Sequence, residues 1–240
     1  MRACIVAMLA VILNSACASS GSMGTGSTNS PPLPTDARDV TRSAPSPVPG
    51  LVQDPAAVPP GFGTLRQDDI AIRLALPGGL QVRAMPLDES YIRLLSPDSY
   101  RAMRELIASK QTEIDRLQER VRLPAYALWL VNFFAQEQGE TRFSPMEIVI
   151  RNGGLDFRPL DAFGLTPGFG EYRLRQRETQ SALFVFDGQV NPNQPLSIIV
   201  ETAESSGWQT VLQRVERERA LIRSRASAQQ RRDSTSGGTR

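Results

Sequence analysis

Hydrophobic residues occupy both faces of one stretch near the middle of the chain, residues 125–136, which read AYALWLVNFFAQ. Successive side chains of a strand point to opposite faces, and here both sets are apolar except for Asn132. The length would also suit a buried helix, but the aromatic and β-branched residues and the preceding Pro124 favour a strand. We therefore expect a central strand that is covered on both sides.

Residues 69–76 and 80–84 show a simpler alternation of apolar and polar side chains. The Pro77-Gly78-Gly79 run between them is a turn signal, so we predict a hairpin before the central strand. Residues 91–95 are expected to form a third short strand in this half of the chain.

Residues 97–122 have the period of a helix. Ser96 suits its N-cap, Pro97 its first position, and Pro124 lies just beyond its end. Lys110 occupies the missing position of an apolar stripe that contains Tyr100, Met103, Ile107, Ile114, Leu117 and Val121. This stripe is typical of a helix that packs on its own sheet, and a coiled-coil partner face is the alternative.

The second half of the chain predicts more strands and a last helix. We expect strands at 145–151, 179–187 and 196–201, with a tight turn at 152–154 and a hairpin joining the last two strands. Residues 155–170 are expected to be irregular. The final helix has an apolar stripe of Trp208, Val211, Leu212, Val215 and Ile222, and we interpret Trp129 and Trp208 as core residues that pack this helix on the sheet.

These elements predict a mainly β (α+β) fold in one globular domain over residues 61–226. We expect an immunoglobulin-like β-sandwich with an inserted helix (about 97–122) and a C-terminal helix (about 207–225). A single antiparallel sheet with helices on one face is the alternative. Residues 227–240 are predicted to be a disordered tail.

The first twenty residues carry a targeting pattern. Arg2 precedes an apolar run that is too short to span a bilayer and is followed by small residues, as in a secretory signal. Cys17 follows Asn14-Ser15-Ala16, and this end resembles the signal peptide of a bacterial lipoprotein, although Asn14 stands where that pattern usually has Leu. An ordinary secretory signal with an incidental cysteine is the alternative.

The resemblance implies that residues 1–16 are removed and that diacylglycerol is attached to the Cys17 sulfur. Ala18 at the next position resembles the outer-membrane sorting pattern of such lipoproteins. Residues 17–60 are rich in Ser, Gly, Thr and Pro, and we predict that they form a disordered tether that holds the domain away from the membrane. The expected location is therefore the cell envelope, with a lipid anchor in the outer membrane.

Composition excludes several kinds of chemistry. The chain has no histidine, so Ser-His-Asp and Cys-His catalysis and His-containing zinc sites are excluded. Its two cysteines are Cys4 and Cys17, so the processed chain cannot form an internal disulfide. A net charge of +2 predicts no general attraction to nucleic acid. We expect no cofactor. We also expect no metal site, because Asp187, Asn191 and Asn193, which could offer oxygen ligands to Ca²⁺, lack the EF-hand spacing and suit a turn.

Two groups of residues are candidates for binding. Phe62 and Phe169 each lie in a Pro-Gly-Phe-Gly run and are either exposed contact points or rings that pack at the edge of the core. Arg173, Arg175 and Arg177 alternate, so in an extended segment they would share one face. That face could hold a phosphate or a peptidoglycan carboxylate, or it could be a charged edge strand that discourages aggregation.

The sequence favours a lipid-anchored, non-catalytic cell-envelope protein whose β-sandwich module binds a protein or cell-wall partner. The alternative is a histidine-free periplasmic glycan hydrolase that uses paired carboxylates. The available acidic pairs are Asp68 with Asp69, Asp88 with Glu89, and Asp156 with Asp161.

Overall fold

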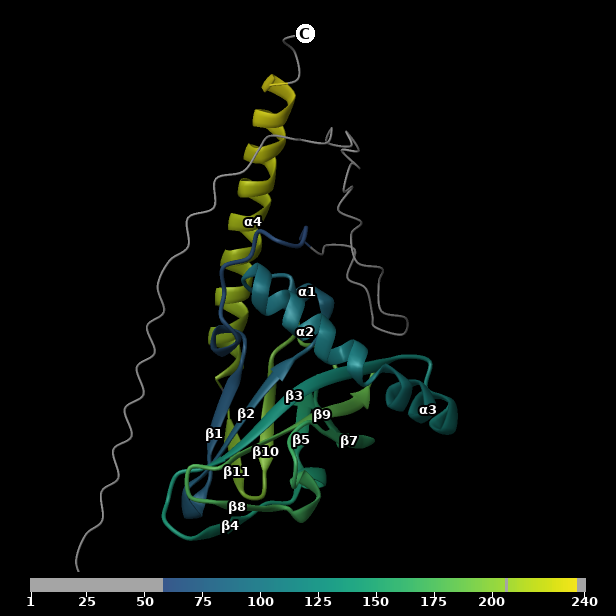
Figure 1. The fold of residues 1–240 in the computed structure, drawn as a ribbon, viewed down its shortest axis with the longest axis vertical. Helices are drawn as coiled ribbons and strands as arrows, with labels where there is room; N and C mark the ends of the chain where they lie inside the picture. Colours follow the sequence, from purple (N-terminus) through teal and green to yellow (C-terminus); the bar gives the residue numbers. More distant parts are fainter. Residues whose placement is uncertain (1–57, 206, 237–240) are drawn as a thin grey trace, which may run out of the picture. The chain divides into compact units, whose positions relative to one another are not determined.

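The computed structural model describes residues 58–205 and 207–236 (Figure 1). The predicted signal peptide, Cys17 and nearly all of the predicted tether lie outside the described residues. Val58 is only 2% exposed, so packing begins a few residues before the expected start of the domain.

A five-stranded antiparallel sheet forms the centre of the fold. Its strand order is β1-β2-β3-β9-β7, so β3 has neighbours on both sides. The strand bounds are β1 Ile72–Ala75, β2 Leu80–Pro86, β3 Tyr126–Ala135, β7 Asp161–Gly164 and β9 Thr179–Asp187. The predicted central strand and the predicted hairpin before it are both confirmed.

A second, four-stranded antiparallel sheet has the order β11-β10-β5-β6. Its strands are β5 Val149–Asn152, β6 Leu155–Phe157, β10 Leu196–Val200 and β11 Ala203–Ser205. A short pair, β4 Glu140–Arg142 with β8 Arg173–Arg175, completes the strands of the described residues. The two larger sheets meet beside β1, where the Ser205 hydroxyl donates a hydrogen bond to the Arg73 carbonyl over 3.3 Å.

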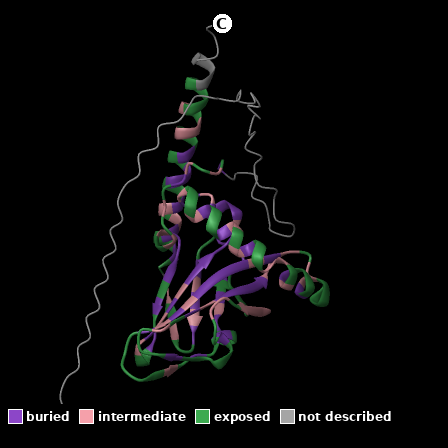
Figure 2. Ribbon diagram, in the orientation of Figure 1, coloured by how far each residue is buried: buried purple, intermediate pink, exposed green. Residues whose placement is uncertain are grey.

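The large sheet has an inner face, which bears Trp129 and Phe133, and an outer face, which bears Tyr126, Leu128 and Asn132. Trp129 and Phe133 share one continuous core with buried residues of the smaller sheet, such as Ile150 and Ile198. Figure 2 shows buried residues running along both sheets. The inner face is therefore the main core of the protein.

Three helices follow β2: α1 (Glu89–Ile92), α2 (Pro97–Ser109) and α3 (Gln111–Val121). The expected single helix over 97–122 is thus divided at Lys110, whose φ of −111° and ψ of 5° are not helical. The apolar stripe packs on the chain's own core as predicted, except that Val121 is exposed. Four 3₁₀ turns connect other elements: η1 Gln67–Asp69, η2 Pro77–Gly79, η3 Pro145–Glu147 and η4 Phe169–Glu171.

The last helix, α4, runs from Trp208 to Ser236. Its stripe lies against the core as predicted, with the Trp208 and Trp129 ring centroids 5.6 Å apart. The prediction of a disordered tail after residue 226 is wrong for residues 227–236, which continue the helix. These residues contain good helix formers and neither Gly nor Pro, so nothing in the local sequence stops the helix.

Some predicted strands, one irregular segment and one hairpin are wrong, because the chain turns or pairs there in a way that the local pattern did not indicate. Residues 91–95 do not form a strand: Tyr91 and Ile92 end α1, which Asp88 caps by accepting a hydrogen bond from the Ser90 backbone, a turn follows, and Leu95 makes only an isolated bridge to Leu65. Residues 145–147 form η3, and residues 155–170 include the strands β6 and β7. β9 and β10 do not form a hairpin, because β9 pairs with β3 and β7 whereas β10 pairs with β5 and β11.

The fold is mainly β, with several antiparallel sheets, none of them closed, and a C-terminal helix. The immunoglobulin-like sandwich is not confirmed. In that fold the chain passes to the second sheet after two strands, whereas here β1, β2 and β3 are neighbours in one sheet.

Candidate functional site

The outer face of the large sheet is covered at one end and open at the other. At the covered end Tyr126 is buried and hydrogen-bonded to Gln111 of α3, and Arg120 of α3 forms an ion pair with Asp161 of β7. At the open end Asn132 is only partly buried. The helices therefore leave half of this face accessible.

A groove of about 520 Å³ occupies the open half. Its walls are mostly polar, with apolar contributions from two strands. The lining residues are Gln67, Asp68, Arg73, Gln81, Val82, Arg83, Leu130, Asn132, Phe134 and Thr179. We call this site the outer-face groove.

Strand register places one polar row across the floor of the outer-face groove. Arg73 of β1 is opposite Arg83 of β2, Arg83 is opposite Asn132 of β3, and Asn132 is opposite Ser181 of β9. Alternation along each strand turns these side chains to the same face. Polar groups from four neighbouring strands are thus brought together from widely separated parts of the sequence.

Asp68 lies between the two arginines. Its carboxylate oxygens are 2.7 Å from Arg73 Nη2 and 2.9 Å from Arg83 Nε. Like charges directly opposite on neighbouring strands repel each other, and this single carboxylate offsets that repulsion. Two positive charges and one negative charge leave the groove with a net positive charge.

Arg83 is the more enclosed of the two arginines, with 25% of its side chain exposed against 63% for Arg73. Burial lowers the pKa of Arg83, the Asp68 charge acts in the opposite direction, and the Arg73 charge lowers it further. Its Nε is inaccessible to solvent and makes an ion pair but no hydrogen bond within the described residues. The groove thus holds a partly desolvated guanidinium with unused donors.

The carboxylates that the sequence offered for glycan hydrolysis all have partners within the described residues. Each accepts a hydrogen bond or forms an ion pair within the described residues: Asp68 with Arg73 and Arg83, Asp69 with Arg214, Asp88 with Ser90, Glu89 with Arg93 and Arg104, Asp156 with Arg151, and Asp161 with Arg120. Only Asp68 lines the outer-face groove.

Phe62 lies apart from the groove and packs partly buried against the core. The following Gly63 has a structural role, since a Cβ there would come within 2.3 Å of the Leu94 backbone. This close approach lets Leu65 pair with the chain at Leu94. The Pro-Gly-Phe-Gly run at 60–63 thus makes a tight backbone contact.

Of the two alternatives for Phe169, the structure has the second, because the ring packs in the core and is not an exposed contact point. The ring is 7% exposed and belongs to an aromatic cluster in which Phe133, Phe143 and Tyr172 have centroids 6.4, 6.0 and 6.0 Å away. Gly168 precedes it with a φ of 81°, which permits the turn that buries the ring.

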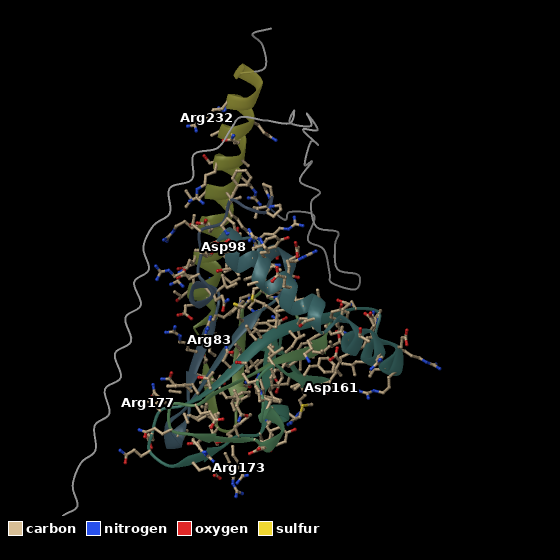
Figure 3. The ribbon with its side chains drawn as sticks, viewed as in Figure 1. Arg83, Asp98, Asp161, Arg173, Arg177 and Arg232 are labelled. Carbon is tan, nitrogen blue, oxygen red and sulfur yellow. The ribbon has the colours of Figure 1, made fainter. Side chains whose placement is uncertain are left out.

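Arg173 and Arg175 are exposed on β8, as alternation predicts, with the buried Leu174 between them. Arg177 does not continue the strand, because its φ of 61° is left-handed and its backbone N–H bonds to the Ala135 carbonyl. Figure 3 shows Arg173 and Arg177 in the region of β4 and β8, apart from Arg83. The three arginines therefore do not form one extended row.

Sequence reasoning missed the outer-face groove, but one signal pointed to it. Asn132 is the single polar residue of an otherwise apolar central strand, and it marks the floor of the groove. Its Oδ1 accepts a hydrogen bond of 2.6 Å from the Ser181 hydroxyl. No local sequence pattern predicts that Arg73, Arg83 and Asp68 lie beside Asn132.

Residues 58–205 and 207–236 contain no cluster of His, Cys, Asp and Glu that could hold a metal ion. Within the same residues no helix is both long and apolar enough to cross a bilayer. Comparisons with protein-family models, curated proteins and solved structures gave no match for this chain.

Proposed function

We propose that this chain is a lipid-anchored, non-catalytic cell-envelope protein whose β-rich domain binds a protein or cell-wall partner in the outer-face groove. The observation that carries this proposal is the groove itself. It is a concavity in which polar side chains converge beside the apolar Leu130 and Phe134, and ligand sites commonly combine such groups.

The arrangement of the sheet supports binding at this place. Leu130 and Phe134 flank Asn132 on the same strand, so the polar floor lies between two apolar side chains. An apolar wall can take the body of a ligand while the polar groups orient it. The lipobox-like pattern at Cys17 and the Ser/Gly/Pro-rich residues 17–60 support a tethered position in the envelope.

The alternative, glycan hydrolysis by two carboxylates, has less support. That chemistry requires two carboxyl groups about 5–10 Å apart that flank the substrate, one of them with a raised pKa. Asp68 is the one carboxylate in the groove lining, and it is ion-paired with both arginines. These facts favour binding over hydrolysis in this groove.

The test is crosslinking in living bacteria with the full-length chain. A photo-reactive amino acid replaces Gln81, which lines the outer-face groove, and the captured species is identified by mass spectrometry. Gln213 is the matched control, because it is an exposed glutamine on α4 outside the groove lining. A second sample carries Cys17→Ala, which removes the predicted lipid attachment.

The proposal predicts an envelope protein or cell-wall fragment that is captured at position 81 and not at position 213. Capture should fall when Cys17 is replaced, because the domain is then no longer held at the membrane. Equal capture at both positions, or none at position 81 in lipidated protein, would refute binding in the groove. Capture unaffected by Cys17→Ala would refute the role of the anchor.

A further inference from the structure

We infer that the outer-face groove binds a carboxylate group of its ligand through the guanidinium of Arg83 and the side-chain amide of Asn132. This inference rests on the proposed function and names the chemical class that the groove selects. Four considerations support it: unused donors, net charge, the engagement of the backbone, and the apolar wall.

The groove offers more hydrogen-bond donors than acceptors. Within the described residues Arg83 and Arg73 form ion pairs with Asp68 alone, so most of the donors of the two guanidinium groups are unused. The Asn132 amide oxygen is already bonded to Ser181, which leaves its NH₂ group as the available part. A ligand that satisfies this site must bring acceptors.

The net positive charge of the groove also favours a ligand that brings acceptors, and specifically a negatively charged one. Asp68 neutralises one of two opposed arginines, so one positive charge remains in a partly enclosed site. Arg83 has 25% of its side chain exposed and its Nε is inaccessible to solvent, so the guanidinium has lost part of its hydration. An anion that pairs with Arg83 restores the lost interactions, whereas a neutral ligand leaves its charge uncompensated.

The geometry favours a carboxylate over a phosphate. Phosphates are commonly held by free backbone N–H groups at helix N-termini or in turns. The residues of the polar row lie in strands that pair with one another, so much of their backbone hydrogen bonding is already used in the ladder. A guanidinium fork binds either anion, so the engaged backbone is the feature that favours a carboxylate, whose two oxygens can be held by side-chain donors alone.

The apolar wall indicates that the carboxylate belongs to a larger organic molecule. Phe134 and Leu130 lie in the lining on either side of Asn132 along β3. A sugar ring or an aliphatic side chain can pack on these residues while its acid group reaches Arg83. Sugar acids and peptide C-termini share this chemistry.

The experiment measures binding of matched probe pairs to the purified full-length chain by isothermal titration calorimetry. N-acetylmuramic acid is compared with N-acetylglucosamine, which lacks the lactyl carboxylate. N-acetyl-alanyl-alanine is compared with its C-terminal amide. Inorganic phosphate is the third anion. The two pairs distinguish a sugar acid from a peptide as the source of the carboxylate.

We expect at least one acid to bind about tenfold or more tightly than its neutral counterpart, as a charge-assisted fork should provide. Arg83→Gln should remove this preference, and Arg83→Lys should restore only part of it because a lysine cannot form the fork. Arg142→Gln is the control, since Arg142 is an exposed arginine of β4 outside the groove lining. It should leave the preference unchanged.

Three results would overturn the inference: no preference for either acid, tighter binding of phosphate, or an equal loss in Arg83→Gln and Arg142→Gln. Thermal unfolding of each variant shows whether a loss of binding reflects a loss of folded protein. If crosslinking at Gln81 identifies a partner but neither acid is preferred, the groove is a binding site for other chemistry. If the acids bind but no partner is captured, the proposed envelope role is wrong.

Discussion

A buried arginine, Arg219, and a partly buried one, Arg83, have opposite surroundings. Arg219 of α4 has 8% of its side chain exposed, and its guanidinium donates hydrogen bonds to Glu216, Ser90 and Asn193 at 2.6, 3.2 and 2.8 Å. It also lies over the Tyr91 ring, 5.3 Å from the centroid. These hydrogen bonds and the ring contact compensate the burial of the guanidinium.

Arg83 is partly buried, and among the described residues its one partner is Asp68. The region around Arg219, which we call the α4 junction, comprises Tyr91, Trp129, Trp208 and Arg219 and fixes the last helix to the core. Arg83 in the outer-face groove does not attach a helix to the core in this way. The contrast suggests that satisfied buried charges stabilise the fold, whereas unsatisfied ones are kept for a ligand.

The largest effect should come from the α4 junction. Trp208 is fully buried, stacks on Tyr91 and donates a hydrogen bond of 2.9 Å from Nε1 to the Pro192 carbonyl. Trp208→Ala should lower the free energy of unfolding by about 3–5 kcal/mol through the cavity it leaves. Denaturant unfolding followed by circular dichroism measures this. A change below about 1 kcal/mol would mean that α4 is not anchored by Trp208.

Stability near the junction should also depend on pH through Glu89. Burial alone would raise the pKa of Glu89, but hydrogen bonds from Tyr100 and Arg93 and the charge of Arg104 outweigh it and hold the pKa below its usual 4.5. A group whose pKa is lowered by folding stabilises the protein above its unfolded pKa and loses that contribution as pH falls. The free energy of unfolding should therefore fall as pH decreases below about 4.5.

Glu89→Gln is the matched test of that dependence. It removes the titrating group while keeping a side chain of the same shape, so the decline below pH 4.5 should become shallower than in the unsubstituted chain. Denaturant titrations at several acidic pH values compare the two proteins. An identical decline in both would show that other carboxylates cause it.

Arg219→Met should cost about 2 kcal/mol, since it removes three hydrogen bonds from a charged donor but keeps an apolar stem of similar length. The measurement is again denaturant unfolding. If the variant is as stable as the original chain, the junction does not depend on its satisfied charge, and the contrast with the groove loses its basis.

The smallest effect should come from the equivalent change in the groove. Arg83→Met should alter the free energy of unfolding by less than about 1 kcal/mol, because few of its donors are used and its repulsion with Arg73 is removed. A slight gain in stability is within this expectation. A loss as large as that of Arg219→Met would make Arg83 a structural arginine and would contradict its assignment to a ligand.

Much of the local structure could be predicted from the sequence. Alternation of apolar and polar residues located β1 and β2, runs that are apolar on both faces located β3 and β9, and the stripe from Trp208 to Ile222 located the buried part of α4. These signals are reliable because side-chain direction follows the local period of the backbone. The break at Lys110 and the helical turn at Tyr91 were missed, since both depend on packing around them.

Pairing and the site were decided only by the tertiary structure. β10 pairs with β5 and not with β9, although β9 precedes it in the chain. The outer-face groove combines lining residues that lie between positions 67 and 83, between 130 and 134, and at 179. The sequence by itself singled out Asn132 and, as a candidate catalytic carboxylate, Asp68. A single sequence shows which face of a strand is apolar, but strand pairing is non-local, and only that pairing brought Arg73, Arg83 and Asn132 into one row.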